Sequence, residues 1–96
     1  MRVRLTDDAR RDQRMIVESM EGFSLAAADR LDEHLRRSIS LLSDNPEIGH
    51  TGDLPGTREL GVAHTPYIVV YAITSEEVVV YRIIHGSRRW PPGDDE

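Results

Sequence analysis

The segment from Tyr81 to Pro92 gathers more chemistry-bearing side chains than any other part of this 96-residue chain. It combines arginines, a histidine next to a glycine, and the only tryptophan, and its candidate functional residues are Arg82, His85, Arg88, Arg89 and Trp90. Arginine presents a planar fork to a phosphate or carboxylate, and tryptophan offers a flat surface for stacking. Functional groups are often found where a strand ends in a loop, so this segment is the first candidate site.

A structural interpretation of the same segment is available. In it, Trp90 covers an edge of a small core, Arg82 pairs with a carboxylate on a helix, and His85 is a hydrogen-bonded structural histidine. Considered from side-chain chemistry alone, this is the more common outcome for such residues.

Several other kinds of chemistry are excluded by composition. The chain has no cysteine and all twelve of its basic residues are arginine, which excludes disulfides, thiolate metal sites, cysteine nucleophiles and Schiff-base lysines. The four histidines are scattered, none lies four residues from another on a predicted helix, and no paired carboxylate completes a metal-binding set. We therefore expect no metal site and no bound cofactor.

The charge balance argues against a dedicated nucleic-acid-binding protein. The net charge is −5, whereas proteins that bind phosphate backbones carry a basic excess. A local basic patch around Arg82, Arg88 and Arg89 is still compatible with this balance.

Residues 1–92 are expected to form one domain, and the acidic residues 93–96 a disordered tail. Because no apolar run is long enough to span a bilayer and the N-terminus has no signal-peptide pattern, we expect a cytoplasmic protein.

The elements that must position these residues follow from hydrophobic periodicity. Two helices, with Thr6 and Ser24 as N-caps, are predicted to end near Met20 and at Asn45. Strands are predicted over 2–6, 57–63, 67–73 and 78–84. The expected architecture is α+β in the order β-α-α-β-β-β, with two N-terminal helices packed on a small antiparallel sheet.

Four stretches in this order closely resemble toxins of the RelE/ParE superfamily, the toxin components of bacterial type II toxin–antitoxin modules. These stretches are residues 45–49, 56–60, 65–71 and 80–91, which read NPEIG, GTREL, TPYIVVY and VYRIIHGSRRWP. The resemblance covers nearly the whole chain, and the length and order of elements of this superfamily match those predicted above.

The resemblance implies one of two activities. RelE-like members are ribosome-dependent mRNA endonucleases, whose basic and aromatic side chains promote attack of a ribose 2′-hydroxyl on the next phosphate. In this chain the first of the three C-terminal strands offers only Arg58 as a basic residue. RelE also carries an arginine near the start of the second of these strands, and that position falls on or near Ile68 here. Arg88 matches the arginine that follows the last strand of RelE. These departures, and the acidic charge, favour the ParE-like branch, which inhibits DNA gyrase and is not a nuclease.

The nuclease alternative remains open, because other RelE-like nucleases use a different set of His, Glu, Arg and Tyr side chains. This chain could supply such a set from His85, Glu59, Arg82 and Tyr81. If the chain is an enzyme, the resemblance implies a ribosome-dependent mRNA endoribonuclease with Arg58, Arg82, His85 and Arg88 as catalytic residues. A third possibility is a non-toxic interaction domain of the same fold.

In either branch the resemblance implies an antitoxin as partner, in a toxin–antitoxin hetero-oligomer. The antitoxin's C-terminal segment would wrap the toxin, laying a helix on its surface and adding a strand to the sheet. Because such tails are acidic, the residues expected to bind the antitoxin or the cellular target are Arg58, Arg82, Arg88, Arg89 and Trp90.

Overall fold

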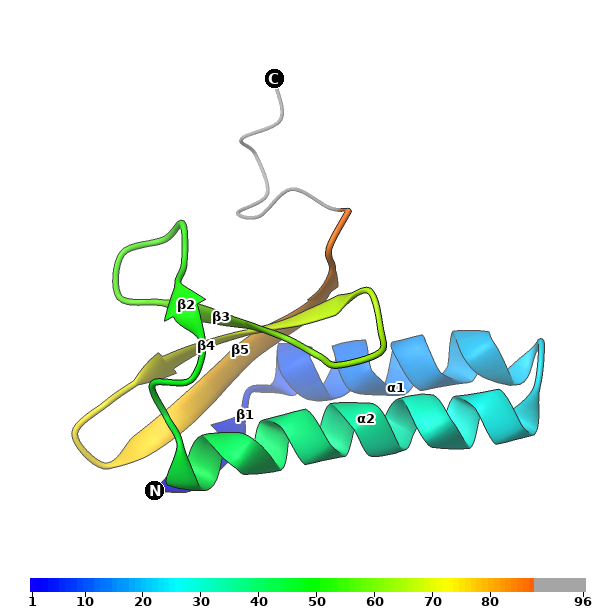
Figure 1. Ribbon diagram of the computed structural model, residues 1–96, viewed down its shortest axis with the longest axis horizontal. Coiled ribbons are helices and arrows are strands. Elements are labelled where there is room, and N and C mark those ends of the chain that lie inside the picture. Colours follow the sequence, from blue (N-terminus) through cyan, green and yellow to red (C-terminus); the bar gives the residue numbers. More distant parts are fainter. Residues whose placement is uncertain (88–96) are drawn as a thin grey trace.

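Two helices and five strands follow one another in the computed structural model, which describes residues 1–87 (Figure 1). They are β1 (Arg2–Leu5), α1 (Asp7–Glu21), α2 (Leu25–Asp44), β2 (His50–Thr51), β3 (Arg58–Gly61), β4 (Tyr67–Ile73) and β5 (Glu77–His85). The α+β class and the order of the long elements are as the sequence predicted. Arg88, Arg89, Trp90 and the tail 93–96 lie outside the described residues.

Both helices begin at the caps that the sequence predicted. The Thr6 hydroxyl accepts a hydrogen bond from the Ala9 N–H, and the Ser24 hydroxyl accepts one from the Ala27 N–H, each at 3.1 Å. Such bonds satisfy backbone donors that have no partner within the first helical turn. The two helices form a hairpin that lies along the sheet (Figure 1), and within residues 1–87 neither is long and apolar enough to cross a membrane.

The strands form one mixed sheet in the order β1-β5-β4-β3-β2. β1 is parallel to β5, and the other neighbours are antiparallel, so the sheet differs in this detail from the antiparallel sheet expected. The two-residue strand β2 was also not expected. Periodicity identifies which residues are extended, but it does not identify which strands pair, and two residues are too few to show a period.

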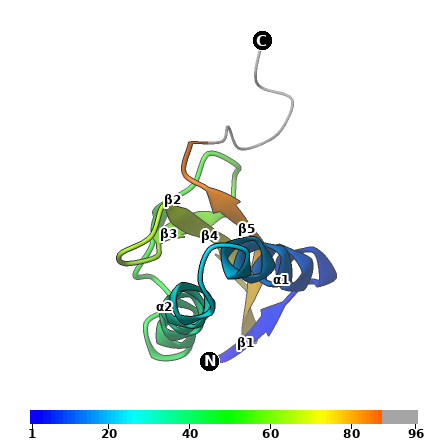
Figure 2. The same ribbon diagram turned by 90° about the vertical axis from the view of Figure 1, so that its right-hand side faces the viewer.

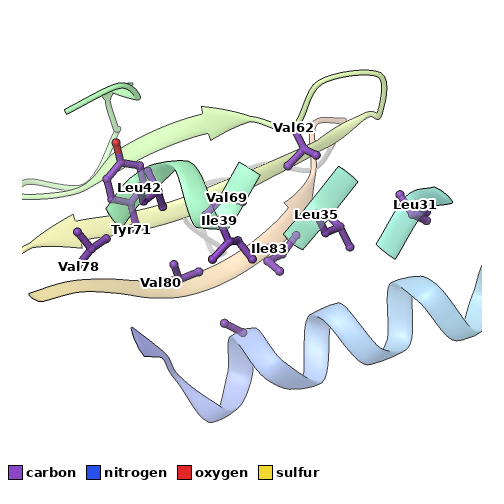
Figure 3. Packing of buried hydrophobic residues seen from close by; sticks show 11 residues of the cluster. Leu31, Leu35, Ile39, Leu42, Val62, Val69, Tyr71, Val78, Val80 and Ile83 are labelled. Carbon is purple, nitrogen blue, oxygen red and sulfur yellow. The ribbon is translucent and has the colours of Figure 1, made fainter. Parts of the chain in front are cut away.

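The core lies between α2 and the sheet, with α1 packed beside it (Figures 2 and 3). The predicted apolar stripe of α2 is buried throughout, and its members are Ala28, Leu31, Leu35, Ile39 and Leu42. These side chains pack on the central strands, where Val69, Val78 and Val80 are fully buried. β4 and β5 are therefore held in place by the core, and this packing positions the end of β5.

A buried tyrosine fixes the loop that follows α2. The Tyr71 hydroxyl donates to the Pro46 carbonyl at 2.7 Å and accepts from the Gly49 N–H at 2.9 Å. Gly49 has no room for a side chain, because an added Cβ would lie 2.7 Å from the Glu59 carbonyl oxygen. These contacts fix the position of the loop against β3 and β4, and β2 begins directly after Gly49.

Candidate functional site

The far end of β5 extends beyond its neighbour β1. β1 pairs with β5 from Glu77 to Val80, where β1 ends. The start of α1 then takes its place along this edge: the Thr6 N–H donates to the Val80 carbonyl, and the Thr6 hydroxyl donates to the Tyr81 carbonyl. α1 therefore runs beside the last residues of β5, and a groove forms between them.

Asp12 of α1 binds the edge of β5 at the point where a strand partner is missing. Its carboxylate accepts two hydrogen bonds from the Arg82 guanidinium, at 2.7 and 3.1 Å, and one from the Ile83 N–H at 2.9 Å. The Asp12 and Arg82 side chains are 15% and 29% exposed, so this pair is well shielded from water. The hydrogen bonds to Asp12 raise the pKa of Arg82 above its ordinary value. This confirms the structural interpretation in which Arg82 pairs with a helix carboxylate.

The groove next to this pair has a volume of about 690 Å³ and an amphipathic lining. α1 contributes the exposed Met15, together with Ile16 and Ser19. The end of β5 contributes His85, and β4 contributes Tyr67, whose ring meets the His85 ring edge-on with centroids 5.4 Å apart. The apolar side chains Met15 and Ile16 of α1, flanked by charged and polar residues of the same helix, thus lie opposite the aromatic and basic end of two strands.

His85 has one ring nitrogen occupied within this groove. Its Nδ1 accepts a hydrogen bond from the Ser87 N–H at 3.0 Å, and the Ser87 hydroxyl lies 2.8 Å from the same atom. A neutral imidazole that accepts at Nδ1 carries its proton on Nε2. In this arrangement neutral His85 can donate a hydrogen bond from Nε2, but it cannot accept one there.

Arg58 lies elsewhere on the sheet. It is cross-strand from Tyr71, whereas His85 is cross-strand from Tyr67 on the other side of β4. Strand spacing and rise then separate the Arg58 and His85 Cα atoms by about 16 Å. The Arg58 guanidinium donates to the Gly49 carbonyl at 2.7 Å and to the Glu47 carbonyl at 3.4 Å.

The candidate residues are thus brought together only in part. Arg82 and His85 share the α1–β5 groove, Arg58 is outside it, and Arg88 is beyond the described residues. Tyr81 and Arg82 also line a second hollow of about 690 Å³, whose apolar lining includes Leu54 and Val70. Among residues 1–87, no group of three or more His, Cys, Asp or Glu side chains could hold a metal ion.

Sequence analysis did not identify Asp12 as part of this site, although the sequence contains a signal for it. Ala9, Asp12 and Ile16 are spaced by three and four residues, which places them on one helical face. A carboxylate on a face that otherwise carries buried groups needs a partner nearby, because burying an unpaired charge is costly. That partner is Arg82.

The chain also matches a known protein family. Residues 3–90 match the family described as the ParE toxin of the type II toxin–antitoxin system parDE. A protein of Sinorhizobium fredii (strain NBRC 101917 / NGR234) named "Putative toxin Y4kP" is 34% identical over 65 residues, which are 68% of this chain and 67% of that protein.

Solved structures show the same fold. The chain resembles a chain of the chromosomal ParDE system of P. aeruginosa, with a TM-score of 0.81, 19% identity and coverage of 88% of this chain and 95% of that one. It also resembles a chain of the intact E. coli RelBE toxin–antitoxin complex, with a TM-score of 0.65, 16% identity and coverage of 91% and 98%. From the match over residues 3–90, the chain belongs to the ParE toxin family of type II toxin–antitoxin systems.

Proposed function

We propose that this ParE-family toxin inhibits DNA gyrase by binding to it, without cleaving RNA, and that a cognate antitoxin neutralises it. The observation that carries the proposal is that Arg58 and Arg82 make hydrogen bonds within the fold. Arg82 is held by Asp12 in a shielded pair, and Arg58 holds the Glu47 and Gly49 carbonyls. Each of the two described arginine candidates therefore has a role within the fold.

Cleavage of RNA through a ribose 2′-hydroxyl needs a base, cations near the crowded phosphate and an acid for the leaving oxygen, all within reach of one another. The described candidates do not provide this constellation. Arg58 is about 16 Å from His85 by strand spacing, and the charge of Arg82 is already balanced by a carboxylate. A net charge of −5 further disfavours binding to a polyanion.

One observation favours the nuclease alternative. Arg82 and His85 lie in the same groove, and neutral His85 can donate a hydrogen bond from Nε2. A cation beside a hydrogen-bond donor can stabilise charge on a phosphate, which is part of what phosphate-ester cleavage requires. The alternative is therefore tested alongside the gyrase proposal.

The α1–β5 groove is the surface on which we place the antitoxin. β5 continues past the end of β1, and beyond Ile83, whose N–H already donates to Asp12, an extended segment of another chain can pair with its edge. Met15, whose residue surface is 59% exposed, offers apolar area beside that edge. The similarity to chains of the ParDE system and the RelBE toxin–antitoxin complex supports a partner of this kind.

The proposal predicts the cellular consequences of tightly controlled induction in bacteria. Growth should stop, DNA-damage signalling should rise, and messenger 5′ ends should remain as they are in uninduced cells. New 5′ ends within translated frames would instead identify a ribosome-dependent nuclease. Normal growth despite accumulation of folded protein would identify a non-toxic interaction domain.

The antitoxin surface is tested with a matched pair of exposed residues. Met15→Asp places a charge in the groove, whereas Leu41→Asp places one at another exposed apolar position, on α2. In calorimetric titration with a cognate antitoxin, Met15→Asp should weaken binding at least tenfold, and Leu41→Asp should leave binding unchanged. Equal affinities of both variants would place the antitoxin on a different surface.

A further inference from the structure

Two histidines that are far apart in the sequence meet on the surface away from the α1–β5 groove. His34 lies on the middle of α2, and His64 lies in the turn between β3 and β4, which passes beside α2 (Figure 1). Their ring centroids are 5.3 Å apart, with the ring planes tilted by 45°. His34 is half-buried and His64 is exposed, so the pair borders solvent.

The backbone at His64 is unusual for a residue with a side chain. His64 is the third residue of a turn in which the Thr65 N–H donates to the Val62 carbonyl, and its φ is +68°. Glycine adopts this left-handed conformation without a steric penalty, and for other residues it costs on the order of 1 kcal/mol. An imidazole therefore stands at a position that favours glycine, and its ring lies next to the ring of His34.

The separation of the rings fits a shared metal ion. Zinc binds an imidazole nitrogen at about 2.0–2.1 Å, so each ring centroid lies about 3.2 Å from the metal, and two rings at the tetrahedral angle have centroids about 5.2 Å apart. The observed separation is 5.3 Å. Imidazole nitrogen is a preferred ligand of zinc and of other late first-row dications, and solvent can fill the remaining positions.

We infer that His34 and His64 form a two-ligand site for a first-row transition-metal dication, with Zn²⁺ as the ion to test. The site would fasten the β3–β4 turn to α2 in the folded chain. Arg30 and Arg37 lie one helical turn from His34, and their charge lowers the affinity for a cation. Glu33 offsets part of this effect, since it pairs with Arg37 at 2.9 Å. The inference is independent of the gyrase proposal.

Thermal unfolding of the full chain, with any affinity tag removed, tests the site. Because a metal that binds only the folded state stabilises it, 100 µM Zn²⁺ at pH 7.5 should raise the Tm by about 5 °C or more. EDTA should reverse the shift, and Mg²⁺, which prefers oxygen ligands, should not produce it. An unchanged Tm in Zn²⁺ would overturn the inference.

Matched variants assign the ligands. The Zn²⁺-dependent shift should disappear in His34→Gln and in His64→Asn, where asparagine is chosen because it tolerates a left-handed backbone. His50→Gln, at an exposed histidine on β2, should keep the full shift. If the shift survives in both His34→Gln and His64→Asn, the metal binds elsewhere and the inference is wrong.

NMR of the wild-type chain gives an answer that does not depend on the folding of any variant. On addition of one equivalent of Zn²⁺, the ring resonances of His34 and His64 should shift together, and those of His50 should not. Shifts confined to His50 or His85 would overturn the assignment.

Discussion

Replacing Asp12 by alanine should destabilise the protein more than any surface substitution, because one carboxylate satisfies two groups from β5. Asp12→Ala leaves the Ile83 N–H without its partner at a residue that is only 3% exposed, which costs about 1–3 kcal/mol. It also removes the carboxylate that balances the Arg82 guanidinium. Since Arg82 is 29% exposed and part of its charge can be solvated, we assign about 1 kcal/mol to this loss.

The sum is about 2–4 kcal/mol, which corresponds to a fall in Tm of roughly 8–32 °C for a domain of this size. Urea denaturation at pH 7 measures the free energy of unfolding. Arg11→Ala is the control, because it removes a pair with Asp8 whose side chains are 59% and 64% exposed and which should contribute less than about 0.5 kcal/mol. Asp12→Asn is informative as an intermediate variant, since its amide oxygen can still accept from Ile83 while the charge is lost.

Hydrogen exchange adds a local readout. Exchange of the Ile83 amide should accelerate in Asp12→Ala beyond what the global loss of stability explains. If Asp12→Ala costs no more than Arg11→Ala, and Ile83 exchange keeps its wild-type rate, Asp12 does not hold the β5 edge and the reasoning is refuted.

Three further substitutions test the fold and its pH dependence. Tyr71→Phe removes the hydroxyl that joins Pro46 and Gly49, and should cost about 2 kcal/mol in urea denaturation, whereas a loss below 0.5 kcal/mol would mean that water replaces the hydroxyl. Ser24→Ala removes the N-cap of α2 and should cost about 1 kcal/mol, with an unchanged Tm as the contrary result. Burial raises the pKa of Asp32, but hydrogen bonds from Arg36 and Gln13 and the Arg36 charge outweigh it, so the net pKa is lowered. The contribution of Asp32 to stability is therefore complete above about pH 5 and lost as the pH falls below about 4. The difference in unfolding free energy between wild type and Asp32→Asn should shrink on acidification. A difference that stays constant from pH 6 to pH 3 would contradict the assignment.

The amino-acid sequence predicts the helices of this fold well, because the signals are local. The spacing of Leu31, Leu35 and Leu42 identifies one buried face of α2, and the hydroxyls of Thr6 and Ser24 cap the helices as expected. Each of these signals depends on residues within a few positions of one another, so periodicity and capping rules suffice.

The features that the sequence did not predict depend on long-range pairing. β1 lies parallel to β5 across more than 70 residues, and the contact between His34 and His64 depends on how the β3–β4 turn sits on α2. Sequence analysis treated the histidines as scattered because it compared their spacing along the chain. It named Arg82 as a candidate for both a binding and a structural role; the position of Asp12 shows the pairing with a helix carboxylate, and the binding role stays a prediction.

Gyrase supercoiling by purified components tests the central claim most directly. Added to gyrase and relaxed plasmid, the purified toxin should suppress supercoiling in a concentration-dependent way, and an equimolar amount of the antitoxin should restore it. The matched control is the preformed toxin–antitoxin complex, which should not inhibit supercoiling. Undiminished supercoiling at a large molar excess of folded toxin would contradict the account.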